Sequence, residues 1–229
     1  DPGTGDLFLV LQNDSPLVLV GTGLARLLTP VGGTWQSTTL TNNGPLGPAI
    51  SAIKVELIVS RAGALFAVES LNSQLVFGEI LGRTTYNYEV AFNQQCGKRS
   101  FVTSAAVLAP NGDPMIACVG GARLYLVSKT GGSWTTELVR AENDNSINLG
   151  LDSKGRLHVA FATPTGVGGA WYGMRDASGW RFEQPDRIVT SAFKTAMTLD
   201  ARGVTHMAYA LAGTSTPIDP VGQHTVSRL

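Results

Sequence analysis

The sequence predicts an all-β fold in which one hairpin-based unit recurs about five times. Its 27 glycines, with only 15% charged residues, suit many short strands joined by tight turns. Glycines placed to close such turns recur every 43 to 58 residues, at Gly5, Gly63, Gly112, Gly155 and Gly203. The segments after them are almost continuously apolar, which is typical of strands covered on both faces. A strand-only repeat of about 45 residues is the length of one four-stranded propeller blade.

Each anchor glycine is predicted to join two strands of a hairpin. The leading strands are expected at 54–60, 104–110, 148–153 and 197–201. The strands after the glycine are expected at 6–11, 64–69, 113–118, 156–161 and 204–209. Asn111-Gly112 is the strongest turn signal, because Asn-Gly favours the backbone of a two-residue hairpin turn.

An aromatic residue, used here as a second landmark, recurs at a similar distance after four of the five turn glycines. Trp35, Trp134 and Trp180 each closely follow a glycine, and Tyr86 takes the same place in the repeat between the first two. These residues lie 22 to 30 positions after their turn glycine. They are interpreted either as wedges between blades or as platforms on which sugar rings stack.

The ends of the chain leave the blade count open. The first repeat begins inside its turn, so its leading strand is expected to be missing. The last is expected to place residues 221–229 as its aromatic-bearing strand, with His224 at the tryptophan position. In a propeller of about five four-stranded blades, ring closure or a partner chain would supply the missing strand. The alternative is part of a six- or seven-bladed propeller.

Composition limits the partners and the compartment. The chain has 17 basic and 17 acidic residues with no basic run, which argues against a nucleic-acid partner. No apolar run reaches the roughly 18 residues of a membrane span. No linker divides residues 1–229, so a single domain is expected. The opening Asp1-Pro2-Gly3, without a start methionine, is interpreted as that of a processed product.

Low charge and abundant Gly, Thr and Ser favour a secreted, cell-surface or periplasmic protein. The two cysteines, Cys96 and Cys118, flank the hairpin at Asn111-Gly112. A disulfide between them and a pair of buried thiols are both open interpretations.

Residues 131–210 carry the most regular repeats. GGSW and SGW are followed by INLGLDSKGRLHVAF and AMTLDARGVTHMAYA, respectively. This pattern of G-x-W, then L-D-x-x-G-x-x-H-V-A-Y, resembles the degenerate repeats of bacterial exported β-propellers. Residues 1–130 carry it loosely, since Ser60 and Ala109 replace Asp while Phe66 and Met115 replace His. The resemblance implies the fold, but such propellers include lectins, polysaccharide lyases and docking modules, so it does not choose a function.

Two histidines are the strongest candidates for catalytic residues. His158 and His206 occupy the same repeat position in adjacent predicted blades. One interpretation is general-base catalysis on an acidic glycan, with Arg175 near the carboxylate and Tyr172 assisting. The other is packing, in which each ring hydrogen-bonds the backbone of a neighbouring blade.

The dipeptide Trp171-Tyr172 is not a repeat landmark, and adjacent strand residues face opposite ways. Trp171, Tyr172, His158 and His206 are therefore the candidate ligand-binding residues. Asp152 and Asp200 are predicted to shape their turns rather than bind metal. No metal site or cofactor is predicted, with Ca²⁺ at the oxygen-rich loop 142–145 as the minority alternative.

The chain lacks the G-x-S-x-G, phosphate-loop, C-x-x-C and H-E-x-x-H motifs. The leading hypothesis is therefore a non-catalytic module that binds carbohydrate or a protein surface. One alternative is a polysaccharide lyase or hydrolase that acts on acidic glycan through the histidine pair. The other is a structural propeller within a larger assembly.

Overall fold

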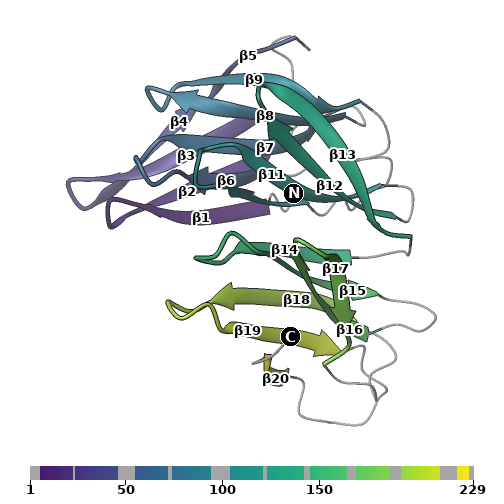
Figure 1. Ribbon diagram of the computed structural model, residues 1–229. Helices are drawn as coiled ribbons and strands as arrows, with labels where there is room; N and C mark the ends of the chain where they lie inside the picture. Colours follow the sequence, from purple (N-terminus) through teal and green to yellow (C-terminus); the bar gives the residue numbers. More distant parts are fainter. Residues whose placement is uncertain are drawn as a thin grey trace. The chain divides into compact units, whose positions relative to one another are not determined.

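The computed structural model describes residues 6–22, 24–45, 55–71, 74–93, 104–120, 123–141, 145–163, 169–185, 192–211 and 221–226. Over these ranges the secondary structure is β-strand without helix (Figure 1). No helix long and apolar enough to cross a membrane occurs in this described part of the chain. The chain forms two compact units, residues 1–102 and 103–229, and each is described by itself.

The described residues of the first unit form two sheets. The first sheet consists, in order, of β1 (Asp6–Gln12), β2 (Ser15–Thr22), β3 (Leu24–Val31) and β4 (Thr34–Thr39). The second has the order β5-β9-β8-β7-β6, with β5 (Thr41–Asn43), β6 (Val55–Val59), β7 (Leu65–Leu71), β8 (Gln74–Leu81) and β9 (Thr85–Phe92). Neighbouring strands are antiparallel except for β5, which pairs in parallel with β9.

The first hairpin corrects the expectation that the first blade lacks its leading strand. β1 and β2 pair antiparallel up to Gln12 and Ser15, so the sheet has four strands of its own. The turn is Asn13-Asp14, with φ of 50° and 61°. Asn and Asp tolerate this left-handed backbone, whereas the hairpin turns were predicted only at glycines. Counted from this turn and not from Gly5, the number of residues to Trp35 is similar to that between turn and aromatic residue in the other repeats.

The second unit contains three sheets among its described residues. The third sheet comprises β10 (Ser104–Leu108), β11 (Pro114–Gly120), β12 (Arg123–Thr130) and β13 (Ser133–Arg140). The fourth comprises β14 (Asn145–Leu151), β15 (Leu157–Thr163), β16 (Gly169–Asp176) and β17 (Gly179–Glu183). The fifth comprises β18 (Ala192–Leu199), β19 (Thr205–Leu211) and β20 (Val221–Val226).

Four of the predicted turn glycines are confirmed. The N–H groups of Gly63, Gly112, Gly155 and Gly203 each donate to the carbonyl three residues earlier, at 2.8–3.0 Å. Their φ values lie between 76° and 88°, a region that side-chain-bearing residues rarely adopt. The fifth anchor, Gly5, lies outside the described residues. The aromatic landmarks Trp35, Tyr86, Trp134 and Trp180 each lie on the outermost antiparallel strand of one of the first four sheets.

The last sheet differs from the expectation. β20 pairs with β19, and His224 stands opposite Met207. β20 is therefore the third strand of its sheet, whereas the aromatic residues of the other sheets lie on the strand after the third. The prediction that residues 221–229 form the aromatic-bearing strand, with His224 at the tryptophan position, was wrong. The reason is that the next strand along the chain pairs directly with its antiparallel predecessor. Residues 227–229 lie outside the described part.

Apolar cores lie between consecutive sheets within each unit. In the first unit, leucines 17, 19 and 27 of the first sheet pack against Ala67, Tyr86 and their neighbours in the second. In the second unit, Phe161 and Val159 pack against Ala105, Ala117 and Leu124 of the third sheet. Met207 and Tyr209 of the fifth sheet pack against Tyr172 and Met174 of the fourth. Cores on both faces explain why the β15 pattern does not alternate with polar residues.

Cys118 on β11 is fully buried and disulfide-bonded. Cys96, the other cysteine of the chain, lies outside the described residues. Between the two interpretations of these cysteines, the structure therefore favours the disulfide.

Candidate functional site

The candidate site begins at the turn between β14 and β15. Asp152 is buried, and its Oδ1 accepts hydrogen bonds from the N–H groups of Lys154 and Arg156, at 2.9 and 2.8 Å. Its Oδ2 accepts a hydrogen bond from Nε of Arg156 at 2.7 Å. Asp200 likewise accepts from the N–H groups of Arg202 and Val204. The turn-shaping role predicted for both aspartates is confirmed.

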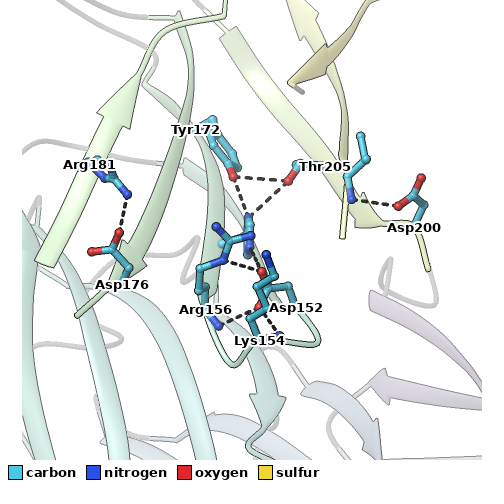
Figure 2. A network of polar contacts seen from close by, with 10 residues as sticks. Asp152, Lys154, Arg156, Tyr172, Asp176, Arg181, Asp200 and Thr205 are labelled. Carbon is cyan, nitrogen blue, oxygen red and sulfur yellow. Dashed lines mark hydrogen bonds and ion pairs between the residues drawn. The ribbon is translucent and has the colours of Figure 1, made fainter. Parts of the chain in front are cut away.

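A buried polar network connects this turn to the next sheet. Nδ1 of His158 lies 2.6 Å from Oη of Tyr172 and 3.3 Å from Oγ1 of Thr205. The two hydroxyls are themselves 3.3 Å apart. All three side chains are at least 97% buried. Figure 2 shows the side chains of Tyr172 and Thr205 in contact near Asp152 and Arg156. Because Tyr172 lies on β16 and Thr205 on β19, the network bridges the fourth and fifth sheets.

The protonation of this network follows from its surroundings. Burial lowers the pKa of His158, although Asp152 opposes the shift. Burial also raises the pKa of Tyr172, so the phenol keeps its proton and the imidazole is neutral. Nε2 of His158 lies 3.4 Å from Oδ2 of Asp152, which favours the ring proton on Nε2. Nδ1 then accepts the Tyr172 O–H, while Nε2 faces the Asp152 carboxylate without forming a hydrogen bond of standard geometry.

His206 is placed differently from its repeat counterpart. Its side chain is 47% exposed, and Nε2 lies 3.6 Å from Oδ2 of Asp200. His206 follows the buried Thr205 on β19, so its side chain points to the opposite face of the strand from the His158 network. The two histidines are thus not gathered around one point.

Trp171 and Tyr172 lie on opposite faces of β16, as predicted. Tyr172 faces the fifth sheet, whereas Trp171 packs with the core between the third and fourth sheets. The guanidinium of Arg140 lies 3.9 Å from the centroid of the Trp171 ring, a cation–π contact. Neighbouring sheets therefore cover both rings, and Trp171 keeps partial exposure.

Arg175 belongs to the Trp171 face and not to the histidine face of β16. Its Nη2 lies 3.0 Å from Oε2 of Glu137 on β13. Oε1 of Glu137 accepts the indole N–H of Trp180 at 3.0 Å, and Trp180 stacks on Phe182 with 5.8 Å between centroids. We call Trp180, Glu137 and Arg175 the Trp180 edge group. The side chains of Glu137 and Arg175 are 39% and 41% exposed.

Glu137 was not among the sequence candidates. It is a single acidic residue in a strand of mixed polarity, and its partners come from a different sheet. Their contact depends on how two sheets pack, which a single-sequence pattern does not report.

No metal site emerges where the structure describes the chain. Within those ranges, no three His, Cys, Asp or Glu side chains are grouped so that they could hold an ion. The minority Ca²⁺ site at loop 142–145 falls largely on residues 142–144, outside the described part.

The Asp152 network predicts a loss of stability in acid. Burial alone would raise the pKa of Asp152, but hydrogen bonds from Arg156 and Lys154, together with the contact to His158, lower it to about 2 from 3.8. The stabilisation is therefore complete above pH 4 and is lost as the pH falls towards 2. It amounts to about 2 kcal/mol at most. The lowered pKa of His158 acts in the same direction from a higher pH.

Chemical denaturation at intervals from pH 7 to pH 2 measures this loss. Asp152→Asn is expected to flatten the slope between pH 4 and 2. Asp200→Asn removes the equivalent but more exposed carboxylate and is expected to change the slope less. Equal effects of the two variants would contradict the role assigned to the buried network.

No family model and no curated protein sequence matches the chain. Its structure is similar to a protein of unknown function from Dyadobacter fermentans, with 13% identity and a TM-score of 0.66 over 96% of this chain and 74% of that one. An ulvan lyase bound to a glucuronic acid–sulfated rhamnose segment aligns with 11% identity and a TM-score of 0.62, over 91% and 66%. An α-L-arabinofuranosidase from Podospora anserina, in complex with cellotriose, aligns with 11% identity and a TM-score of 0.58, over 98% and 90%.

The chain has a β-propeller fold. The matched structures and the five described sheets, most of them four-stranded, confirm the fold class that the sequence predicts. Identities of 11–13% establish a shared fold and no shared activity.

Proposed function

We propose that the protein is a non-catalytic propeller that binds carbohydrate and acts outside the cytoplasm. The Trp180 edge group carries the proposal. It holds an aromatic ring, a carboxylate and a guanidinium together at a partly exposed place. Aromatic faces suit the C–H faces of sugars, and planar charged groups suit pairs of hydroxyls. The interlocking contacts hold these groups in place before a ligand arrives, which reduces the entropy cost of binding.

Two further observations support this proposal. Structural neighbours include an ulvan lyase and an arabinofuranosidase whose structures contain bound saccharides, so this fold accommodates such ligands. The disulfide at Cys118 supports an oxidising compartment, because disulfides persist mainly in exported proteins.

The geometry gives little support to the lyase alternative. A general base must reach the substrate proton, either directly or through one water. His158 is 2% exposed, and its Nδ1 already meets the Tyr172 hydroxyl. His206 points away from this network, and Arg175 lies on the other face of β16.

The test is a glycan array followed by calorimetric titration with the tightest-binding oligosaccharide. Trp180→Ala is expected to weaken binding tenfold or more, since stacking aromatic residues dominate such contacts. Trp35→Ala is the matched control, because Trp35 stands on the outer strand of its sheet and is 54% exposed. Its affinity should stay within twofold of the wild type.

Three results would contradict the proposal. They are an absence of binding to any glycan, equal losses in the two tryptophan variants, and release of unsaturated uronic products from acidic polysaccharide. The last is followed by absorbance in the near ultraviolet and would restore the lyase hypothesis.

A further inference from the structure

Glu69 on β7 is a carboxyl group inside an apolar core. Only 1% of the residue is exposed, and it points into the core between the first and second sheets, on the same side of β7 as Leu65 and Ala67. Its neighbours across the sheet are Val55 and Val76. Among the described atoms, its Oε2 has no hydrogen-bond partner. A buried, unsatisfied carboxyl oxygen costs free energy and calls for an explanation.

The repeat shows that packing alone does not require this carboxyl. The equivalent position, six residues after the turn glycine, holds Cys118, Phe161 and Tyr209 in the three other hairpins that turn on a glycine. These residues are also at least 97% buried. Among these four positions only the one on β7 carries a carboxyl group. A carboxyl group is costly to bury, and the other three hairpins place less polar side chains there.

The surroundings contain no described cation that could neutralise Glu69. The tyrosines Tyr86 and Tyr88 of β9 face the same core, and Oη of Tyr86 donates to the carbonyl of Ala67. The first sheet contributes Val10, Leu17, Leu19 and Leu27.

The nearby charged side chains face elsewhere. By register, Glu56, Glu79 and Glu89 stand opposite Val68, Phe66 and Phe77, which lie on the other face of β7 and β8. Arg26 of β3 is exposed and precedes the buried Leu27, so it points away from the core. An ionised Glu69 would therefore have no described cation beside it in a core made of apolar side chains and two tyrosines.

We propose that Glu69 makes the contact between the first and second sheets depend on proton concentration near neutral pH. With the carboxyl protonated, the two sheets pack as described. Loss of the proton places an uncompensated charge in their shared core, and β1 and β2 then separate more often from β6 and β7. This is a conformational control that is independent of glycan binding at the Trp180 edge group.

The ionisation range and its sign support this inference. Burial raises the pKa of Glu69 from 4.5 to about 7. The folded state therefore binds the proton more tightly than the opened state does. Stability is full below pH 4.5, declines as the pH rises, and levels off above pH 7.

Hydrogen exchange of the full chain at several pH values tests the proposal. After correction for intrinsic exchange rates, the opening equilibrium at β1, β2 and β7 amides is expected to rise about thirtyfold from pH 5.5 to 8.5. Amides of β15 serve as an internal reference and should change less. Glu69→Gln, which stays neutral, is expected to abolish the rise. Glu79→Gln, on the other face of the same sheet, is expected to retain it.

Two further measurements cover a failure of the glutamine variant to fold. Glu69→Leu should show the same loss of pH dependence. The carboxyl ¹³C shift of Glu69 in the wild-type protein should titrate near pH 7. Titration near 4.5, or an equal pH response in wild type and the neutral variants, would overturn the proposal.

Discussion

Replacing Phe161 by alanine is expected to lower the free energy of unfolding by about 3–5 kcal/mol, the range for a buried phenylalanine. Phe161 on β15 is 0% exposed. Its ring meets Phe182 edge-on at 6.1 Å and lies under the guanidinium of Arg140, 5.3 Å from the centroid. The truncation removes apolar contact and leaves a cavity between the third and fourth sheets, which rigid strands fill poorly.

Denaturant unfolding of the variant and the wild type measures this change. Leu138→Ala is the control, because Leu138 on β13 is 51% exposed and its truncation should alter stability by less than about 0.5 kcal/mol. If Phe161→Ala cost no more than this control, the sheets would not share the core described above.

Gly78→Ala is expected to destabilise the first unit by about 3 kcal/mol or more. A Cβ at Gly78 would overlap the carbonyl oxygen of Asn87 and would stand 2.6 Å from Cα of Tyr88. Both belong to the backbone of β9, which pairs with β8 at this point. Since backbone in a paired strand moves only when its hydrogen bonds give way, the clash has no easy relief.

Gly173→Ala gives the matched comparison for Gly78→Ala. The new Cβ at Gly173 would also be too close to its neighbours, at 2.5 Å from the Phe182 ring and 3.0 Å from Val159. These are side-chain atoms, and Phe182 is partly exposed, so rotation can relieve much of the overlap. Thermal unfolding should therefore show the larger drop in midpoint for Gly78→Ala. The reverse order would argue against the close approach of β8 and β9.

Local signals in the sequence predicted the hairpins well because turns and strands are decided by neighbouring residues. Gly63, Gly112, Gly155 and Gly203 each mark a real turn, as their left-handed backbone requires. The first hairpin was missed because its turn is Asn13-Asp14, where asparagine and aspartate replace glycine in the same conformation. The signal was present, since both residues are known for tolerating this backbone.

The candidate site was less predictable because it depends on contacts between sheets. The His158 position was recognised, but its burial is due to Thr205 and Tyr172, which approach from separate strands. His206 has the same repeat position and a different environment. The pairing of Arg175 with Glu137 rather than with the histidine face follows from strand alternation once β16 is placed. Sequence spacing predicts such alternation, but not which sheet stands opposite each face.

The parallel pairing of β5 with β9 has a consequence for solubility. After leaving the first sheet, the chain runs along the outer strand of the second, and the N–H of Thr41 donates to the carbonyl of Thr84 at 2.8 Å. Unsatisfied backbone groups on an outermost strand can recruit a strand from another molecule and begin aggregation. The short connecting segment occupies part of that edge with backbone of its own chain, so self-association through β9 is blocked where β5 lies.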